Sequence, residues 1–200
     1  GAFGRGTGPR PQPGPRPAGR AKDPPRTIPL ACTLEELFTG VTRKYKLSKT
    51  LTDPMGNAMQ LEKVLQIEVQ AGWRQGTKIT FEREGDEAPD RIPADLIFVI
   101  EEAEHDRFRR DGSDLVYTHK ISLTQALSGC EFEVEHLDGS MVPVVIDYVV
   151  SPSTEVKIKG RGMPSKKGPG NLIVKFDIEF PARLKSKEQV AFLRDGPFGL

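Results

Sequence analysis

An internal repeat constrains the fold of this chain more than any other feature of its sequence. The segment Thr33–Gly40 recurs as Ser122–Gly129, shifted by 89 positions. A second echo in the same order pairs Gly85 and the run Asp95-Leu96-Ile97 with Gly162 and the run Asn171-Leu172-Ile173. One short match could arise by chance, but two in the same order indicate duplication. The sequence therefore predicts two similar domains in tandem.

Alternation of apolar and polar residues predicts that both domains are built from strands. Val41, Arg43, Tyr45 and Leu47 alternate with polar neighbours, and Asp-Gly pairs and other turn residues separate the runs. Thr33 and Glu36 have the spacing of a capping box, and Gly40 is placed to end a short helix. The expected strands are 28–30, 41–49, 61–69, 77–82, 95–101, 114–121, 130–136, 141–150, 155–159 and 171–180. The expected fold class is mainly β: two tandem β-sandwich-like domains with short helical turns, followed by a C-terminal helix over Ser186–Asp195.

Composition divides the chain into four expected parts. Residues 1–26 hold six Gly, seven Pro and a net charge of +5, which predicts a flexible basic linker, whereas the other residues carry −4. The first β-domain is expected at 27–105, the second at 106–183, and a helix with a tail at 184–200. No Met begins the chain and no targeting segment is recognisable, so we expect a fragment of a longer protein.

The residues that could carry chemistry are few and scattered. Two Cys and three His are too few for a disulfide scaffold, a four-Cys zinc site or a His-rich metal centre. Cys32 and Cys130 lie in apolar, strand-like settings, which favours small buried side chains over nucleophiles. No acid, base and nucleophile come together in the pattern. The sequence thus predicts a protein that is not an enzyme and that needs no metal and no cofactor.

The strand near residue 45 offers two interpretations that the residues alone leave nearly even. Its cations, Arg43, Lys44, Lys46 and Lys49, could simply keep an edge strand soluble. Alternatively, the interleaved Tyr45 and Leu47 could line apolar pockets beside that edge, where an extended peptide would add as a strand.

Several ordered motifs resemble the C-terminal substrate-binding region of the DnaJ family of J-domain co-chaperones. They cover roughly residues 28–195 and are Leu34–Gly40, Gly72–Ile79, Glu84–Asp86, His105–Leu115, Leu137–Gly139, Gly160–Pro164 and Gly170–Val174. The J-domain tripeptide His-Pro-Asp is missing, and so is the Cys-rich zinc module of one subclass. The chain thus resembles the C-terminal half of a type II, zinc-free member.

The resemblance implies a site and partners that can be assigned to particular residues. A hydrophobic peptide pocket would be formed by Ile28, Leu30, Tyr45, Leu47 and Phe98. Arg43 and Lys46 would bind the acidic Glu-Glu-Val-Asp tail of a DnaK-type heat-shock chaperone. Members of the family are homodimers joined by C-terminal helices, which here implies contacts through Val190, Phe192 and Leu193 within Leu184–Asp195.

The function expected from the resemblance is that of a cytoplasmic co-chaperone which binds unfolded client polypeptides and the partner's tail. No nucleic-acid or membrane partner is expected. The alternatives are a non-chaperone dimeric β-scaffold, or nucleic-acid binding through the basic N-terminal segment. The second domain carries Glu131, Glu133 and Glu135 where the first has cations. We therefore expect no anionic-tail site there, only a spacer and support.

Overall fold

The computed structural model describes residues 21–183 and 186–196. Most of the expected linker, residues 1–20, lies outside this part of the chain. The described chain is already held in place at Lys22, which bridges to Ile92 and forms an ion pair with Asp95 at 2.6 Å. Paired backbone therefore begins a few residues before the expected end of the linker.

The first repeat contains one helix and five strands, and its strands form two sheets. Strands β1 (Arg26–Cys32), β5 (Leu96–Glu102) and β4 (Lys78–Phe81) form one sheet in the order β1-β5-β4. The long strands β2 (Val41–Thr52) and β3 (Ala58–Val69) form a separate two-stranded sheet. Helix α1 (Leu34–Thr39) connects β1 to β2. Tyr45 of β2 contacts Phe98 of β5 edge to face at 5.0 Å, so the two sheets face one another.

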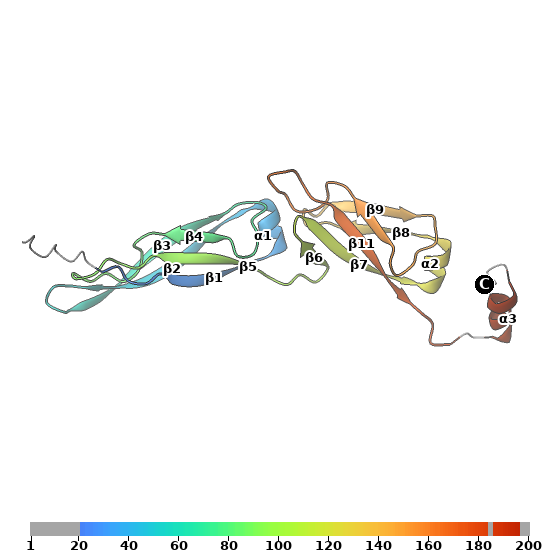
Figure 1. The fold of residues 1–200 in the computed structure, drawn as a ribbon, viewed down its shortest axis with the longest axis horizontal. Helices are drawn as coiled ribbons and strands as arrows, with labels where there is room; N and C mark the ends of the chain where they lie inside the picture. The colour runs from blue at the N-terminus through green and yellow to red at the C-terminus, as the bar shows by residue number, and fades with distance from the viewer. Residues whose placement is uncertain (1–20, 184–185, 197–200) are drawn as a thin grey trace, which may run out of the picture. The chain divides into compact units, whose positions relative to one another are not determined.

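The second repeat has the same plan with an additional edge strand. Its larger sheet has the order β10-β11-β7-β6 and consists of β6 (Phe108–Asp111), β7 (Asp114–Ser122), β10 (Glu155–Ile158) and β11 (Leu172–Glu179). Strands β8 (Cys130–Glu135) and β9 (Met141–Ile146) form the smaller sheet. Helix α2 (Leu123–Ser128) lies at the end of β7 (Figure 1). Phe132 of β8 stacks on His119 of β7 at 3.7 Å and so joins the two sheets.

The two helical turns confirm the repeat at the level of single hydrogen bonds. Thr33 and Glu36 form a capping box, and Ser122 and Gln125 form the same box in the second repeat. Each helix ends at a glycine with positive φ, +81° at Gly40 and +88° in its counterpart, a conformation that glycine adopts without steric cost. The duplicated sequence therefore encodes a duplicated strand–turn–strand unit.

By its contacts the chain divides into two compact units that do not coincide with the repeats. One unit contains Lys46–Val64, Ile79–Ile97 and the chain up to Ile28, and it includes the outer part of the β2–β3 hairpin. The other contains the remaining residues, including the entire second repeat. In the second unit, Arg110 donates to the carbonyl oxygen of Trp73 at 2.8 Å and connects the chain after β3 to strand β6. The domain boundary expected near residue 105 stays a prediction.

The mainly β fold class is confirmed, and several elements differ from expectation. Strands β2 and β3 each extend three residues further toward the turn that connects them. Strand β6 was not predicted, because four residues with one apolar side chain leave no alternation to detect. Strand β9 ends at Ile146 rather than continuing to Val150. Helix α3 (Lys187–Asp195) follows the expectation closely. Of the described helices, none is long and apolar enough to span a membrane.

Candidate functional site

Strand β2 separates its side chains cleanly into two sets. Odd-numbered residues from Val41 to Lys49 are half-buried or buried, and the even-numbered Thr42, Lys44, Lys46 and Ser48 are exposed. This is the alternation that a strand with one solvated face must show. The predicted cations of β2 therefore lie on opposite faces and cannot all act together.

Arg43 and Lys49, on the inner face, are already engaged inside the protein. Arg43 Nη1 donates to the carbonyl oxygen of Ala31 at 2.7 Å, and its guanidinium group pairs with both carboxylate oxygens of Glu36. The hydrogen bond from Arg43 lowers the pKa of Glu36 below its ordinary value, so the pair stays ionised at neutral pH. Lys49 is buried and donates to Glu87 at 2.5 Å. Both cations thus support the fold.

Lys44 and Lys46, on the outer face, are exposed and lack an ion-pair partner among the residues that the structure describes. Successive residues of one face lie about 7 Å apart along a strand, close to the spacing of alternate carboxylates on an extended peptide. These two ammonium groups are the free positive charge of β2.

The five predicted pocket residues divide into three core residues and two accessible ones. Phe98, Leu47 and Leu30 are 0%, 5% and 9% exposed, so they belong to the core of the sandwich. Ile28 and Tyr45 are half-buried and present apolar surface to solvent. Of the five, Ile28 and Tyr45 are therefore the two whose side chains are accessible from solvent.

The edge of β2 that faces away from β3 is open along most of its length. Among the residues that the structure describes, only those at the far end occupy it: Thr52 donates its amide to the carbonyl oxygen of Glu87, and the amide of Thr50 donates to Asp86. Since amides of alternate residues in a strand point the same way, those of Lys44, Lys46 and Ser48 also face this edge. In the described chain, β2 has no strand neighbour besides β3. Residues 41–49 are thus available for strand addition.

Sequence reasoning missed Asp86 and Glu87, which cover the end of the edge; Glu87 also binds the buried Lys49. Both lie in a segment without alternation, and their contacts with β2 join residues 36 to 38 positions apart. The run Glu84-Gly85-Asp86-Glu87 gave the only signal, an acidic turn opposite a basic strand.

The other chemically interesting residues do not form a second centre of reactivity. No cluster of three or more metal-ligating side chains exists in the described chain. Burial raises the pKa of the thiols of Cys32 and Cys130, which keeps both protonated and poorly nucleophilic.

Of the predicted dimer contacts, Val190 and Leu193 are 40% and 43% exposed on α3, and the side chain of Phe192 is outside the described part.

Comparison with known proteins places this architecture in a family. The family model for the DnaJ C terminal domain matches residues 26–181, which include both sandwiches. The chain therefore belongs to the DnaJ C-terminal domain family. The resemblance seen in the sequence is confirmed, and its relatives of subfamily B agree with the type II subclass.

The curated relatives are longer proteins. DnaJ homolog subfamily B member 5 of Homo sapiens is 41% identical over 195 residues, which are 92% of this chain and 56% of that protein. DnaJ protein homolog 1 of Drosophila melanogaster is 45% identical over 169 residues, covering 82% of this chain and 50% of that protein. Protein SIS1 of Saccharomyces cerevisiae is 34% identical over 168 residues, covering 82% and 47%. The chain thus spans about half the length of these relatives.

Proposed function

We propose that this chain acts as the polypeptide-binding part of a co-chaperone. It binds extended segments of unfolded clients, and the acidic Glu-Glu-Val-Asp tail of a DnaK-type heat-shock chaperone, by strand addition at β2. Membership of the DnaJ C-terminal domain family supports a co-chaperone role. The two ligand classes and the cytoplasmic location stay predictions.

The observation that carries this proposal is the open edge of β2 with free cations beside it. The amides of Lys44, Lys46 and Ser48 face the edge, while the ammonium groups of both lysines have no ion-pair partner in the described chain. An extended four-residue tail spans about 13 Å, roughly the length of residues 44–47. Main-chain hydrogen bonds would provide affinity for any extended segment, and the lysines would select one with carboxylates.

The two predicted tail-binding residues would act differently. Lys46, exposed on the outer face, would contact a carboxylate of the tail directly, with Lys44 beside it. Arg43 is paired with Glu36 and bound to the carbonyl oxygen of Ala31, so it would hold β1 and β2 in position. We propose Arg43 as a positioning residue and Lys46 as a contact.

The apolar part of the site would begin at Ile28 and Tyr45. A Leu- or Phe-sized side chain gains roughly 1.5–3 kcal/mol on full burial, and half-buried surroundings provide only part of that. Two or three such contacts, after ordering costs, correspond to micromolar affinity, about −8 kcal/mol. Leu30, Leu47 and Phe98 remain the inner wall of the proposed pocket. Affinity of this size allows a chaperone to release its client.

A titration with a fluorescent peptide ending in Glu-Glu-Val-Asp tests the proposal. We expect Lys46→Ala to weaken binding about threefold to fivefold, since an exposed ion pair contributes up to about 1 kcal/mol. Lys157→Ala, which removes an exposed cation from β10, is the matched control. Equal affinity of the wild type and Lys46→Ala would refute the tail site.

Client binding needs a different variant, because Leu47 is buried and Leu47→Asp would unfold the sandwich. Tyr45→Ser removes accessible apolar surface while the strand stays polar at its rim. We expect this variant to keep its fold by circular dichroism and to lose suppression of client aggregation. Undiminished suppression would place client binding elsewhere.

Homodimerisation through α3 is part of the same proposal. Val190 and Leu193 leave substantial apolar surface exposed on a helix of nine residues, which a second copy could cover. Sedimentation of Phe192→Asp and Leu193→Asp should show monomers if α3 forms the interface. A dimer that survives both substitutions would place the interface elsewhere.

A further inference from the structure

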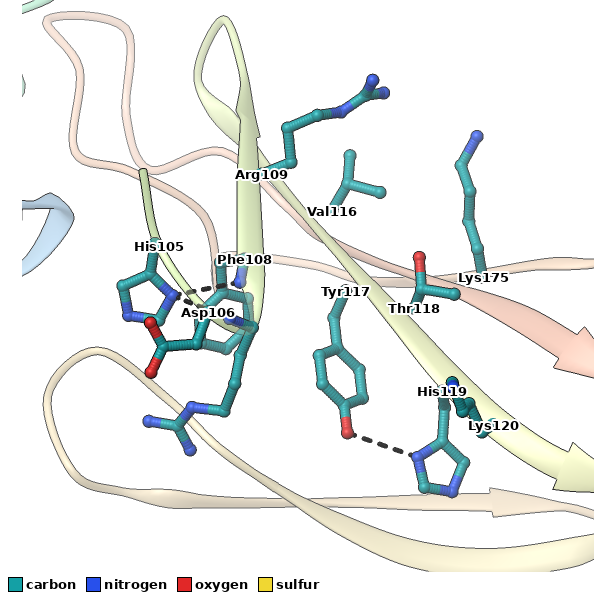
Figure 2. A pocket seen from close by; sticks show the side chains of 11 residues that line it. His105, Asp106, Phe108, Arg109, Val116, Tyr117, Thr118, His119, Lys120 and Lys175 are labelled. Atoms are coloured by element: carbon teal, nitrogen blue, oxygen red, sulfur yellow. Dashed lines mark hydrogen bonds between the residues drawn. The ribbon is translucent and has the colours of Figure 1, made fainter. Parts of the chain in front are cut away.

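The second repeat contains a cavity of about 780 Å³ at the border between β6 and β7 (Figure 2). Its lining includes four Lys or Arg side chains, Arg107, Arg109, Lys120 and Lys175, and one carboxylate, Asp106. The walls of this cavity are therefore strongly positive, although the second repeat was expected to be only a spacer.

Two of these four cations are not neutralised by a neighbour. Arg107 pairs with Glu135 at 2.7 Å, and Lys175 pairs with Glu155 at 2.8 Å. No described residue forms an ion pair with Arg109 or Lys120, although Asp177 lies opposite Lys120 in the register of β11 and β7. The cavity thus retains positive charge that a ligand could neutralise.

The cavity lies along a part of β7 whose backbone is unpaired on one side. Strand β6 pairs with β7 only from Asp114 to Tyr117, whereas β11 pairs with β7 as far as Ser122. The amide of Leu115 donates toward β11, to Asn171 at 2.9 Å. By alternation, the amides and carbonyl oxygens of Thr118 and Lys120 point to the side where β6 has ended. A further strand could pair there in line with β6.

The two faces of this edge differ in chemistry. Arg109 is the register partner of Val116, so it shares the outer face of the sheet with Thr118 and Lys120. Tyr117 and His119 point to the opposite face, where the hydroxyl group of Tyr117 lies 3.3 Å from His119 Nδ1 (Figure 2). A strand added here would meet cations with every second side chain and aromatic rings with the side chains between.

We propose that this edge of β7 binds an extended segment of a partner protein in which carboxylate side chains alternate with apolar ones. The segment pairs with the main chain at Thr118 and Lys120, places its carboxylates near Arg109 and Lys120, and packs its apolar side chains on Tyr117 and His119. Residues 1–20, 184–185 and 197–200, which lie outside the described part, contain no Asp or Glu and so cannot supply this segment. This site is independent of the one proposed on β2.

Fluorescent peptides that differ only in pattern test the inference. The probes are Glu-Val-Glu-Val-Glu-Val, the block isomer Glu-Glu-Glu-Val-Val-Val, and the alternating peptide with every second amide N-methylated. The protein carries Lys44→Glu and Lys46→Glu, so that acidic peptides bind the β2 site only weakly. We expect the alternating peptide to bind at least about fivefold more tightly than either of the others, since only it pairs both backbone and charge.

Two matched substitutions locate the site on the protein. Lys120→Glu should weaken the alternating peptide by about tenfold, because it removes one attraction and adds one repulsion. Lys157→Glu, on the far edge strand of the same sheet, should leave binding within about twofold. Equal losses of affinity in both variants would show that only the net charge of the protein matters, and would overturn the proposal.

Hydrogen exchange of the unsubstituted chain gives a test that does not depend on whether any variant folds correctly. Saturating alternating peptide should protect the amides of Thr118 and Lys120, which face the open edge. Binding without that protection, or equal binding of the N-methylated peptide, would overturn strand addition. If a single-stranded RNA binds more tightly than the peptide and its binding depends on Lys120, the ligand of this edge is a nucleic acid and not a polypeptide.

Discussion

Strands β2 and β8 occupy the same place in the two repeats and carry opposite charge. Each follows a capped helical turn that ends in a glycine, and each pairs with a single strand in the described chain. The repeat aligns Lys44 with Glu133 and Lys46 with Glu135. The amide of His136 donates to Ser140 on the β9 side, so the amides of these glutamates face the open edge, as those of the lysines do.

The backbone amides of this edge thus have the same arrangement in both repeats, whereas the outward-facing side chains differ in charge. The available edge also differs in length, because β2 has 12 residues and β8 has six. In the second repeat, the cavity-lining cations that lack an ion-pair partner in the described chain lie not on β8 but on β6 and β7, at Arg109 and Lys120. We therefore expect the side-chain chemistry of each edge, rather than its fold, to determine which ligand it binds.

The largest expected effect is on peptide affinity, when the charges of β2 and β8 are exchanged. We expect Lys44→Glu with Lys46→Glu to weaken the Glu-Glu-Val-Asp peptide at least about tenfold. Adding Glu133→Lys and Glu135→Lys should restore measurable binding, now at β8, and release Arg107 from its pair with Glu135. Fluorescence anisotropy at low and high salt measures both. If the lysine-free β2 edge still binds as the wild type does, charge is not what distinguishes the repeats.

Alanine at the two helix-ending glycines should destabilise the repeats unequally. Both positions have positive φ, which costs a residue with a Cβ roughly 1–2 kcal/mol. A Cβ at Gly129 would also lie 2.4 Å from the carbonyl oxygen of Ile146, whereas one at Gly40 would lie 3.1 Å from that of Val69. We expect losses of about 3 kcal/mol for Gly129→Ala and about 1–2 kcal/mol for Gly40→Ala. Hydrogen exchange of core amides in each repeat measures both, and equal losses would contradict the difference in packing.

A smaller difference in stability is expected between substitutions of Glu36 and Gln125, the third residues of the two helix caps. Glu36 and Gln125 both accept from the capping backbone, but only Glu36 also binds Arg43. We expect Glu36→Ala to cost about 2 kcal/mol and Gln125→Ala about 1 kcal/mol. Thr33→Ala and Ser122→Ala, which remove the capping hydroxyl groups but leave the third residues of the caps in place, should cost about 1 kcal/mol each and serve as controls. If Glu36→Ala costs no more than Gln125→Ala, Arg43 does not depend on this partner.

The smallest expected effect is electrostatic and lies in the β8–β9 turn. Ser140 donates its hydroxyl and its amide to Asp138, which lowers the pKa of this carboxyl to about 2. A lowered folded-state pKa stabilises the protein above the unfolded pKa, near 4, and this contribution disappears as the pH falls through about 2. Ser140→Ala should therefore raise the pKa of Asp138 and reduce stability at neutral pH but not below pH 2. NMR titration of the carboxyl carbon measures it, and an unchanged pKa would contradict the assignment.

Structural features that depend on a pattern over several neighbouring residues could be predicted from the sequence. The repeat, both helical turns and most strands were predictable, because caps and alternation act locally. The cations of β2 were also predictable as a group. Their division was not, since it depends on Glu36 and Glu87, which come from other elements.

The unpredicted features arise from contacts between distant parts of the chain. Strand β6 has only four residues and owes its place to pairing with β7. The cavity beside it was hidden as well, because it depends on where the pairing of β6 with β7 stops, at Tyr117 of β7, and leaves the next residues of β7 unpaired on that side. Burial of Leu30, Leu47 and Phe98 was also hidden, because alternation shows which residues share a face but not how deeply they are covered.

Hydrogen exchange of the β2 amides tests the central claim most directly. With saturating Glu-Glu-Val-Asp peptide, the account predicts slower exchange at Lys44, Lys46 and Ser48, with little change at Thr50 and Thr52, which are already bonded. Tight binding of that peptide without any slowing at Lys44, Lys46 and Ser48 would contradict strand addition at this edge.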